Sequence, residues 1–122
     1  MRARLARLRA ERDRLVFDVR SLRISQRRLK ARLEHRADRL RVRELAKDKD
    51  VLDCFCYTGG FTVNALSGGA KTVLSVDSSA DSLTVCTENV ALNQLSADRH
   101  TTHEGDVFQV LRRFRDERRS FD

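Results

Sequence analysis

Leucines recur at helical spacing through the first 46 residues, which contain no glycine or proline. One heptad position is filled by leucine from Leu8 to Leu29, and a second is only partly filled because Arg12 and Gln26 interrupt it. The filled position holds Leu8, Leu15, Leu22 and Leu29, and the partly filled one holds Leu5, Val19 and Leu33. Fewer than four clean heptads give only a weak coiled-coil signal. We therefore predict that residues 1–46 form a helical arm or hairpin, with its leucine stripe packed on a partner.

After Lys47–Asp50 the pattern changes to short apolar runs separated by turns. Val51–Cys56 is nearly continuous and apolar, as expected of a strand buried on both faces, and Thr72–Val76 is a second, β-branched run. Thr101–Glu104 is a weaker third strand. Helices are predicted over Phe61–Leu66, from an N-cap at Ser78-Ser79 to about Leu95, and from Val107 past Phe114.

This order of elements is β-α-β-α-β-α, which favours a right-handed parallel α/β unit. We predict an α/β fold: residues 47–122 form about three parallel strands with helices, as half of a doubly wound sheet. The final Ser120-Phe121-Asp122 is typical of the approach to a fourth strand.

Charge is distributed unevenly along the chain. The formal net charge is +7, but Met1–Asp50 carries about +10 and Val51–Asp122 about −3. A basic arm attached to a mildly acidic domain favours a polyanionic partner, with nucleic acid first and membrane headgroups second, although an Arg-rich solvated helix face is the alternative. No apolar run approaches the ~20 residues that span a bilayer, and the N-terminus has no signal-peptide pattern. We therefore expect a cytoplasmic protein with no membrane association.

Three cysteines are present: Cys54, Cys56 and Cys86. The first two are spaced to share one face of the predicted strand, and no second pair completes a zinc site. We interpret all three as reduced core thiols and expect no metal.

The chemistry is concentrated where the first two strands end. Gly59 and Gly60 allow the backbone to approach a ligand closely, and the next helix begins there with free N–H groups. Asp77 ends the second strand, at a spacing near that of an acid that accepts hydrogen bonds from ribose hydroxyls. The alternative is that the glycines form only a tight turn and that Asp77 only caps a helix.

The turn favours one class of nucleoside cofactor over another. A pyrophosphate-binding turn requires a third glycine that this chain lacks, whereas S-adenosylmethionine has no phosphate. Asp106 follows the third strand, where it could accept from an adenine amino group or simply cap the Val107 helix. Methyl transfer therefore fits better than hydride transfer.

The run Asp53-Cys54-Phe55-Cys56-Tyr57-Thr58-Gly59-Gly60-Phe61 closely resembles motif I of bacterial large-subunit ribosomal RNA methyltransferases, the group that contains the 23S rRNA cytosine-C5 enzymes. The resemblance continues through Glu88-Asn89-Val90-Ala91-Leu92-Asn93 and Gly105-Asp106-Val107-Phe108. It implies a Rossmann-like methyltransferase sheet that binds S-adenosyl-L-methionine, with 23S rRNA as partner. Tyr57, Thr58, Gly59, Gly60 and Phe61 would surround the methionine end, Asp77 with Ser78 beside it would hold the ribose, and Asp106 with Val107 would hold the adenine.

Other family features are missing. The Asp-Pro-Pro motif that lines the methyl-transfer pocket is absent because the chain has no proline, and no cysteine matches the family's catalytic one. Only His35-Arg36 and the arginines of residues 39–43 resemble the upstream D-Q/H-R motif. We therefore assign no catalytic residue and expect a truncated front half that binds the cofactor weakly and transfers no methyl group alone.

Without a fourth strand, Val51–Cys56 would be an open apolar edge that invites self-association, as would the leucine stripe.

Two other functions remain open: a non-catalytic RNA-binding or helical interaction protein that uses its basic arm, and, less favoured, a dinucleotide-dependent oxidoreductase. A related guanine methyltransferase shares nearly the same front half, so the target base stays open.

Overall fold

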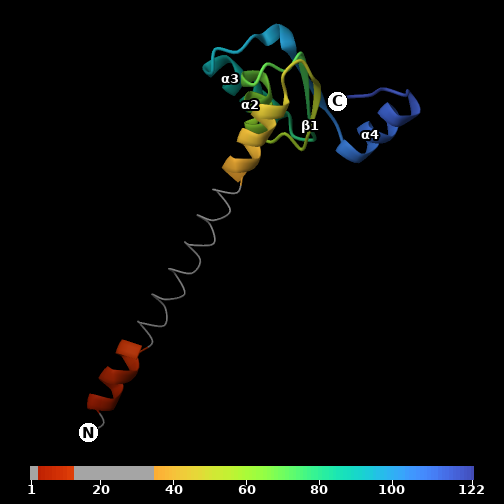
Figure 1. The fold of residues 1–122 in the computed structure, drawn as a ribbon. Helices are drawn as coiled ribbons and strands as arrows, with labels where there is room; N and C mark the ends of the chain where they lie inside the picture. The colour runs from red at the N-terminus through yellow and green to blue at the C-terminus, as the bar shows by residue number, and fades with distance from the viewer. Residues whose placement is uncertain (1–2, 13–34) are drawn as a thin grey trace. The chain divides into compact units, whose positions relative to one another are not determined.

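The computed structural model describes residues 3–12 and 35–122, which fall into two units, Met1–Arg36 and Ala37–Asp122 (Figure 1). In the first unit residues 3–12 are helical, as predicted, and Leu5 and Leu8 are each about half exposed. The remaining leucines of the heptad pattern lie outside the described residues. None of the described helices is long and apolar enough to cross a membrane.

The second unit contains a three-stranded parallel sheet with the order β1-β2-β3. The strands are β1 (Asp50–Cys54), β2 (Thr72–Asp77) and β3 (His100–Glu104). The helices are α2 (Gly60–Ser67), α3 (Ala80–Leu92), the short η1 (Ala97–Arg99) and α4 (Val107–Asp116), and residues 37–45 before β1 are also helical. The predicted α/β fold with three parallel strands is confirmed.

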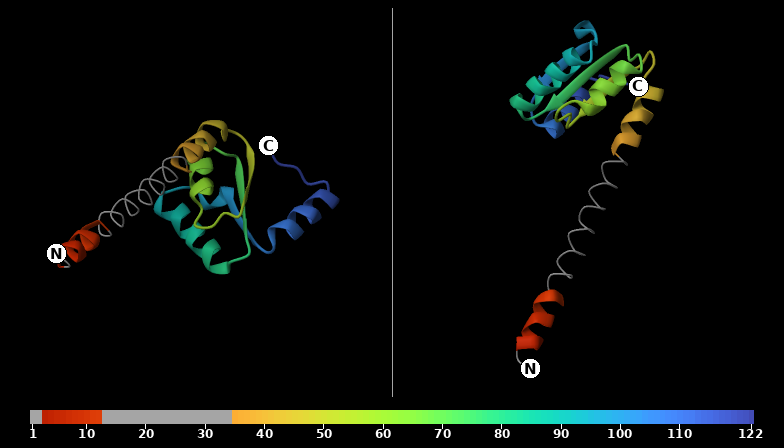
Figure 2. Two further views of the ribbon diagram at one scale, coloured as in Figure 1. Left: turned by 90° about the horizontal axis from the view of Figure 1, so that it is seen from below. Right: turned by 90° about the vertical axis from the view of Figure 1, so that its left-hand side faces the viewer.

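Alternating residues of β2 build a core on each face of the sheet. Val73 packs with Ala65 of α2 and Val90 of α3, whereas Val76 packs with Val110 and Phe114 of α4. Helix α4 accordingly lies on the side of the sheet opposite α2 and α3 (Figures 1 and 2). Burial on both sides explains why Val73, Leu74 and Val76 of β2 do not alternate regularly with exposed polar residues.

The predicted common face for Cys54 and Cys56 is wrong. Strand β1 ends at Cys54, and Phe55 then turns with a φ of 55°. Cys54 is consequently half-buried beside the α4 cluster, whereas Cys56 is buried with Leu83 and Cys86 of α3. The strand period applies only while the chain stays extended, and it does not stay extended past Cys54.

Two other boundaries differ from the sequence prediction. Helix α3 ends at Leu92 rather than near Leu95, with Asn93 as its C-cap, and its N-cap is Ser79, whose side chain accepts from the Ser82 N–H at 3.2 Å. Helix α2 ends at Ser67, one residue beyond the predicted Leu66, with Gly68 as its C-cap. A side chain on Gly68 would overlap the backbone carbonyl of Arg43, and this close approach explains why a glycine is needed there.

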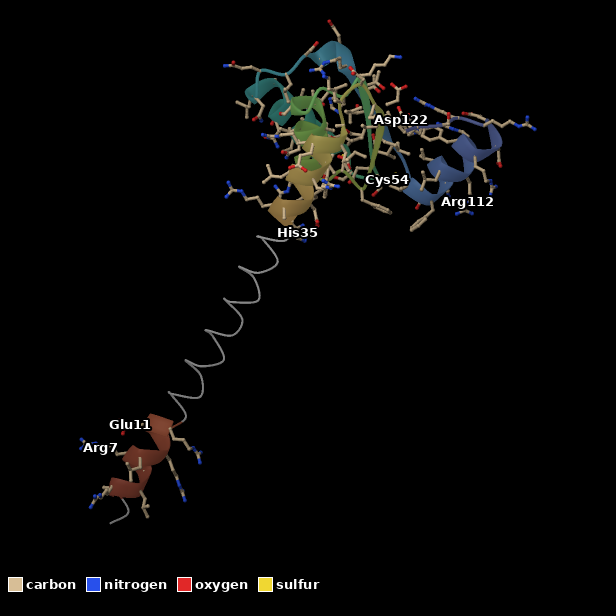
Figure 3. All side chains as sticks on the ribbon, in the orientation of Figure 1. Arg7, Glu11, His35, Cys54, Arg112 and Asp122 are labelled. Atoms are coloured by element: carbon tan, nitrogen blue, oxygen red, sulfur yellow. The ribbon has the colours of Figure 1, made fainter. Side chains whose placement is uncertain are left out.

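The last residues return to the outer edge of β1. The Asp122 N–H donates to the Asp50 carbonyl at 2.9 Å, and the Asp122 carboxylate accepts from the Asp50 N–H at 2.8 Å (Figure 3). Phe121 packs on Phe114, and the Arg119 guanidinium lies over both rings. In the described sheet β2 is the only strand paired with β1, so β1 lies at an edge, and self-association through that edge stays a prediction.

Candidate functional site

The segment between β1 and α2 has an unusual backbone. Phe55, Tyr57 and Gly59 all have positive φ, at 55°, 51° and 86°. A left-handed conformation costs a residue with a side chain roughly 1–2 kcal/mol, so other contacts must hold it in place. Here the Cys56 N–H donates to the Val76 carbonyl at 3.2 Å, and the Gly59 N–H donates to the Cys56 carbonyl at 2.8 Å.

Asp77 ties this loop to the end of β2. One carboxylate oxygen accepts from the Tyr57 N–H at 3.1 Å, and the other accepts from the Ser79 N–H at 2.9 Å. Each oxygen keeps a second lone pair, so the carboxylate can still accept from a ligand hydroxyl. Ser78, beside it, is exposed. The carboxyl ends of β1 and β2 are therefore held together by the acid that the sequence singled out.

Gly59 allows the loop to rest directly on α3. A side chain here would lie 2.5 Å from the Cys86 sulfur, and its φ of 86° disfavours any other residue. Helix α2 begins at Gly60, so the N–H groups of Gly60 and Phe61 have no acceptor within the helix and are available for an anionic or carbonyl ligand.

A buried polar network supports the loop from beneath. The Thr62 hydroxyl donates to Asp53 at 2.6 Å and lies 2.6 Å from the Ser75 hydroxyl, which is 2.9 Å from Nε2 of His100. Burial raises the pKa of Asp53, although hydrogen bonds from Thr62 oppose this, and burial lowers the pKa of His100. The network thus joins α2 to all three strands.

Cys54 and Cys56, the thiols at the start of the loop, are poor nucleophiles. Burial, together with the neighbouring Cys86, Asp53 and Asp77, raises the pKa of Cys56 to about 12. Burial also raises the pKa of Cys54, and Cys86 is fully buried. Since the thiolate is the reactive form, these side chains suit a packing role. In the described part of the chain, no three His, Cys, Asp or Glu side chains are grouped so that they could hold a metal ion.

The second predicted acid, Asp106, caps a helix. Asp106 accepts from the Gln109 N–H at 2.9 Å with one oxygen, as N-cap of α4. Val107, predicted to contact adenine, has its side chain in the core with Leu74 and Val76, so only its backbone could face a ligand. Phe108 is instead exposed and meets the ring of Phe55 edge-on, with centroids 5.6 Å apart.

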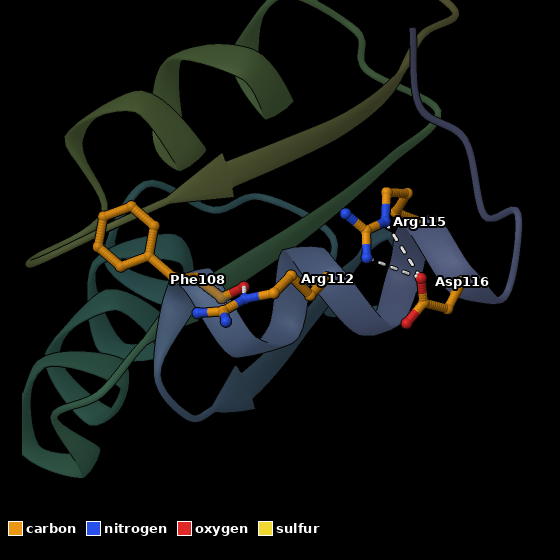
Figure 4. A network of polar contacts seen from close by, with 4 residues as sticks. All are labelled: Phe108, Arg112, Arg115 and Asp116. Carbon is orange, nitrogen blue, oxygen red and sulfur yellow. Dashed lines mark hydrogen bonds and ion pairs between the residues drawn. The ribbon is translucent and has the colours of Figure 1, made fainter.

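Beyond Phe108, α4 presents arginines. The Arg112 guanidinium donates to the Phe108 carbonyl at 3.2 Å, and Arg115 pairs with Asp116 at 3.0 Å (Figure 4). These groups are exposed, so their contribution to stability is small.

The predicted residues line separate hollows. Thr58, Gly59 and Gly60 line one of about 230 Å³ between α2 and α3, and Asp106 lines one of about 290 Å³ beside His103 and Arg113. Tyr57 and Phe61 are exposed, at 71% and 38%.

Sequence reasoning gave no role to two residues of the first hollow. Arg39 extends along Gly60, with its Cδ 3.1 Å from where a side chain at that position would begin. The Asn89 side chain donates to the Thr58 carbonyl at 2.8 Å. Asn89 belongs to the Glu88–Asn93 run that resembles the family, but no spacing rule connects it to a residue 31 positions earlier.

A parallel sheet with a glycine turn after β1 and an acid at the end of β2 is typical of nucleoside-cofactor enzymes. The family model for S-adenosylmethionine-dependent methyltransferases matches residues 13–118, and the chain belongs to that family.

Similar curated proteins narrow the group. The chain is 48% identical over 90 residues to ribosomal RNA large subunit methyltransferase I of Enterobacter sp. (strain 638) and 47% identical to that of Cronobacter sakazakii. Each match covers 74% of this chain and 23% of the relative, so the chain spans about a quarter of those proteins.

Solved structures agree with this placement. SMU.776, described as a methyltransferase complexed with SAH, superposes with a TM-score of 0.69 at 31% identity, covering 74% of this chain and 24% of that one. A SAM-dependent methyltransferase from Streptococcus mutans gives a TM-score of 0.67 at 31% identity, covering 71% and 23%. The partial Rossmann-like methyltransferase fold predicted from the sequence is confirmed.

Proposed function

We propose that this chain forms the S-adenosylmethionine-binding part of a ribosomal RNA methyltransferase that acts on cytosine C5 of 23S rRNA. The observation that carries the proposal is the Asp77 carboxylate, which bonds the Tyr57 backbone beside the first turn of α2. This brings an acceptor for ribose hydroxyls next to free N–H groups at the carboxyl edge of a parallel sheet. The bound cofactor would supply the methyl group.

In this proposal the chain's residues bind and orient the ligand. Tyr57, Thr58, Gly59, Gly60 and Phe61 surround the methionine end, where the N–H groups of Gly60 and Phe61 can donate to the carboxylate. Asp77 and Ser78 hold the ribose. Asp106 keeps one oxygen without an assigned hydrogen bond after capping α4, and that oxygen can accept from the adenine amino group, with the Val107 backbone adjacent.

The RNA partner is supported by the names of the similar proteins and by the +10 charge of Met1–Asp50. Acting on ribosomal RNA would place the protein in the cytoplasm. The residues assigned in this proposal bind the ligand rather than react with it, and burial raises the pKa of Cys56, the thiol within the loop, to about 12. The methyl-transfer chemistry of the proposed enzyme therefore requires residues beyond those assigned here.

Titration with S-adenosylhomocysteine by calorimetry tests the cofactor site. Asp77→Asn removes the charge but keeps the shape, so we expect the affinity to fall about tenfold or more, the usual cost of losing a charge-assisted hydrogen bond. Asp81→Asn, an exposed change in the first turn of α3, is the matched control and should leave affinity unchanged. Equal affinity of Asp77→Asn and the unchanged chain would contradict the proposal.

One alternative function keeps specific support. Residues 3–12 form a helix with four arginines, at Arg4, Arg7, Arg9 and Arg12. In the alternative function this arm binds RNA without any methyl transfer. In that case the α/β unit would be a relic, and RNA affinity would depend on the arm alone.

A further inference from the structure

Asn89 joins α3 to the middle of the loop between β1 and α2. Its side-chain amide donates to the Thr58 carbonyl at 2.8 Å, and the residue is half-buried. A carbonyl oxygen can only accept, so the amide nitrogen of Asn89 must face it. The side chain is thus fixed in one orientation by its partner.

The peptide that Asn89 bonds is held at both ends. Its carbonyl, from Thr58, accepts from Asn89, and its N–H, from Gly59, donates to the Cys56 carbonyl at 2.8 Å. The next carbonyl, from Gly59, accepts from the Val63 N–H at 2.8 Å in the first turn of α2. Because these peptide planes are fixed, the N–H of Gly60 points in a single direction.

The Cys86 side chain also holds this part of the loop, by filling the space next to Gly59. It lies three residues before Asn89, so both side chains project from one face of α3. Cys86 is fully buried, and its sulfur occupies the space that a side chain on Gly59 would need. One helix face therefore holds two successive loop residues, Thr58 by a hydrogen bond and Gly59 by contact.

We infer that Asn89 is a positioning residue that sets the Thr58–Gly59 peptide and thereby the N–H groups that receive the amino-acid end of the cofactor. This rests on the proposed function, in which Thr58, Gly59 and Gly60 contact the methionine end, whereas Asp77 and Asp106 contact the nucleoside. Asn89 does not touch the nucleoside side, so its effect is confined to one end of the ligand.

Two ligands separate that effect from general destabilisation. S-adenosylhomocysteine has the amino-acid end, and methylthioadenosine keeps the nucleoside but lacks it. In calorimetric titrations of the full chain, Asn89→Ala should lower the affinity for S-adenosylhomocysteine about five- to tenfold, the equivalent of one hydrogen bond. It should change the affinity for methylthioadenosine less than twofold. Equal losses for both ligands, or no loss for either, would overturn the inference.

The matched control is Thr84→Ala. Thr84 is also on α3 and is exposed, and its hydroxyl donates to the Ala80 backbone carbonyl of the same helix at 3.1 Å. It should affect neither ligand. If Asn89→Ala does not fold, Asn89→Asp keeps the side-chain size but replaces the donor with an acceptor facing the Thr58 carbonyl, and the same selective loss is expected.

Amide hydrogen exchange in the free chain tests the inference without any ligand. In Asn89→Ala the Gly59 N–H should exchange about five- to tenfold faster, because its peptide is then held at one end only. In Thr84→Ala the exchange rate of the Gly59 N–H should be unchanged. If the unchanged chain binds neither ligand, the proposed cofactor site fails, and Gly59 exchange alone then decides whether Asn89 positions the loop. Unchanged Gly59 protection in Asn89→Ala would refute the positioning role.

Discussion

At the residue scale, the loop after β1 contains residues whose backbone conformation is not explained by their own side chains. Phe55 and Tyr57 have left-handed backbones although neither is glycine or asparagine. Hydrogen bonds from Cys56 to β2 and from Tyr57 to Asp77 hold that conformation. Gly59 differs, because both its φ and the Cys86 sulfur exclude a side chain.

Gly59→Ala should therefore destabilise the chain by about 2 kcal/mol or more, from left-handed strain together with overpacking against Cys86. Urea unfolding measures this. Cys86→Ala in the same chain should recover the overpacking part, so the double variant is less destabilised than the sum of the single changes. Gly60→Ala is the control, because its φ is not positive and its nearest neighbour is the flexible Arg39 side chain. A cost for Gly60→Ala equal to that of Gly59→Ala would contradict this account.

At the element scale, polar side chains link α2 to the sheet in a layer that is otherwise apolar. Asp53 of β1, Thr62 of α2 and Ser75 of β2 are all buried, and the chain of contacts ends on His100 of β3. No buried side-chain nitrogen or oxygen in the described residues lacks a partner. A network that is satisfied in this way fixes the register between layers, at the cost of a buried carboxyl.

That cost makes stability depend on pH. Because the pKa of Asp53 is raised above 3.8 in the folded chain, the folded state holds this proton more tightly than the unfolded state. The contribution of Asp53 therefore favours folding at low pH and is lost as pH rises from about 4 through the folded pKa. Asp53→Asn should be more stable than the unchanged chain at pH 7, and the difference should shrink toward pH 4.

Urea unfolding at several pH values measures this difference. Asp98→Asn, at an exposed carboxyl, is the control and should leave the pH profile unaltered. The explanation from burial would be wrong if Asp53→Asn were less stable than the unchanged chain at pH 7.

The sequence predicts the helices and strands themselves better than the contacts between them. The three strands and α2, α3 and α4 were expected within a few residues, because their apolar periods are set by burial on known faces. The opposite placement of Cys54 and Cys56 was not expected, since it depends on the turn at Phe55. Asn89 had no predicted role because its partner, Thr58, becomes a neighbour only when α3 packs beside the loop.

At the scale of the whole molecule, charge and cofactor chemistry belong to different segments. Met1–Asp50 is strongly basic, and the groups proposed to hold the cofactor all lie between Tyr57 and Val107. The second unit has its own cores on both faces of the sheet. The two activities should therefore separate on deletion.

Deletion of residues 1–33 should leave S-adenosylhomocysteine affinity within about twofold and reduce affinity for a 23S rRNA fragment. Phosphate contacts release counterions, so the slope of log affinity against log salt should also become shallower. Calorimetry and filter binding over a range of salt concentrations measure the two quantities. Loss of cofactor binding with the arm would argue against independent segments, and unchanged RNA affinity would exclude the arm as the main RNA contact.

The sequence by itself determined the α/β class, the parallel order of the elements and the candidate cofactor residues. These depend on local period, glycine placement and an acid at a strand end, all of which are encoded within short stretches of chain. Only the tertiary structure decided how the loop after β1 is held, that Val107 is directed into the core, and that Asp122 returns to Asp50. Those outcomes depend on contacts between residues tens of positions apart, whose distance is fixed only when the helices pack on the sheet.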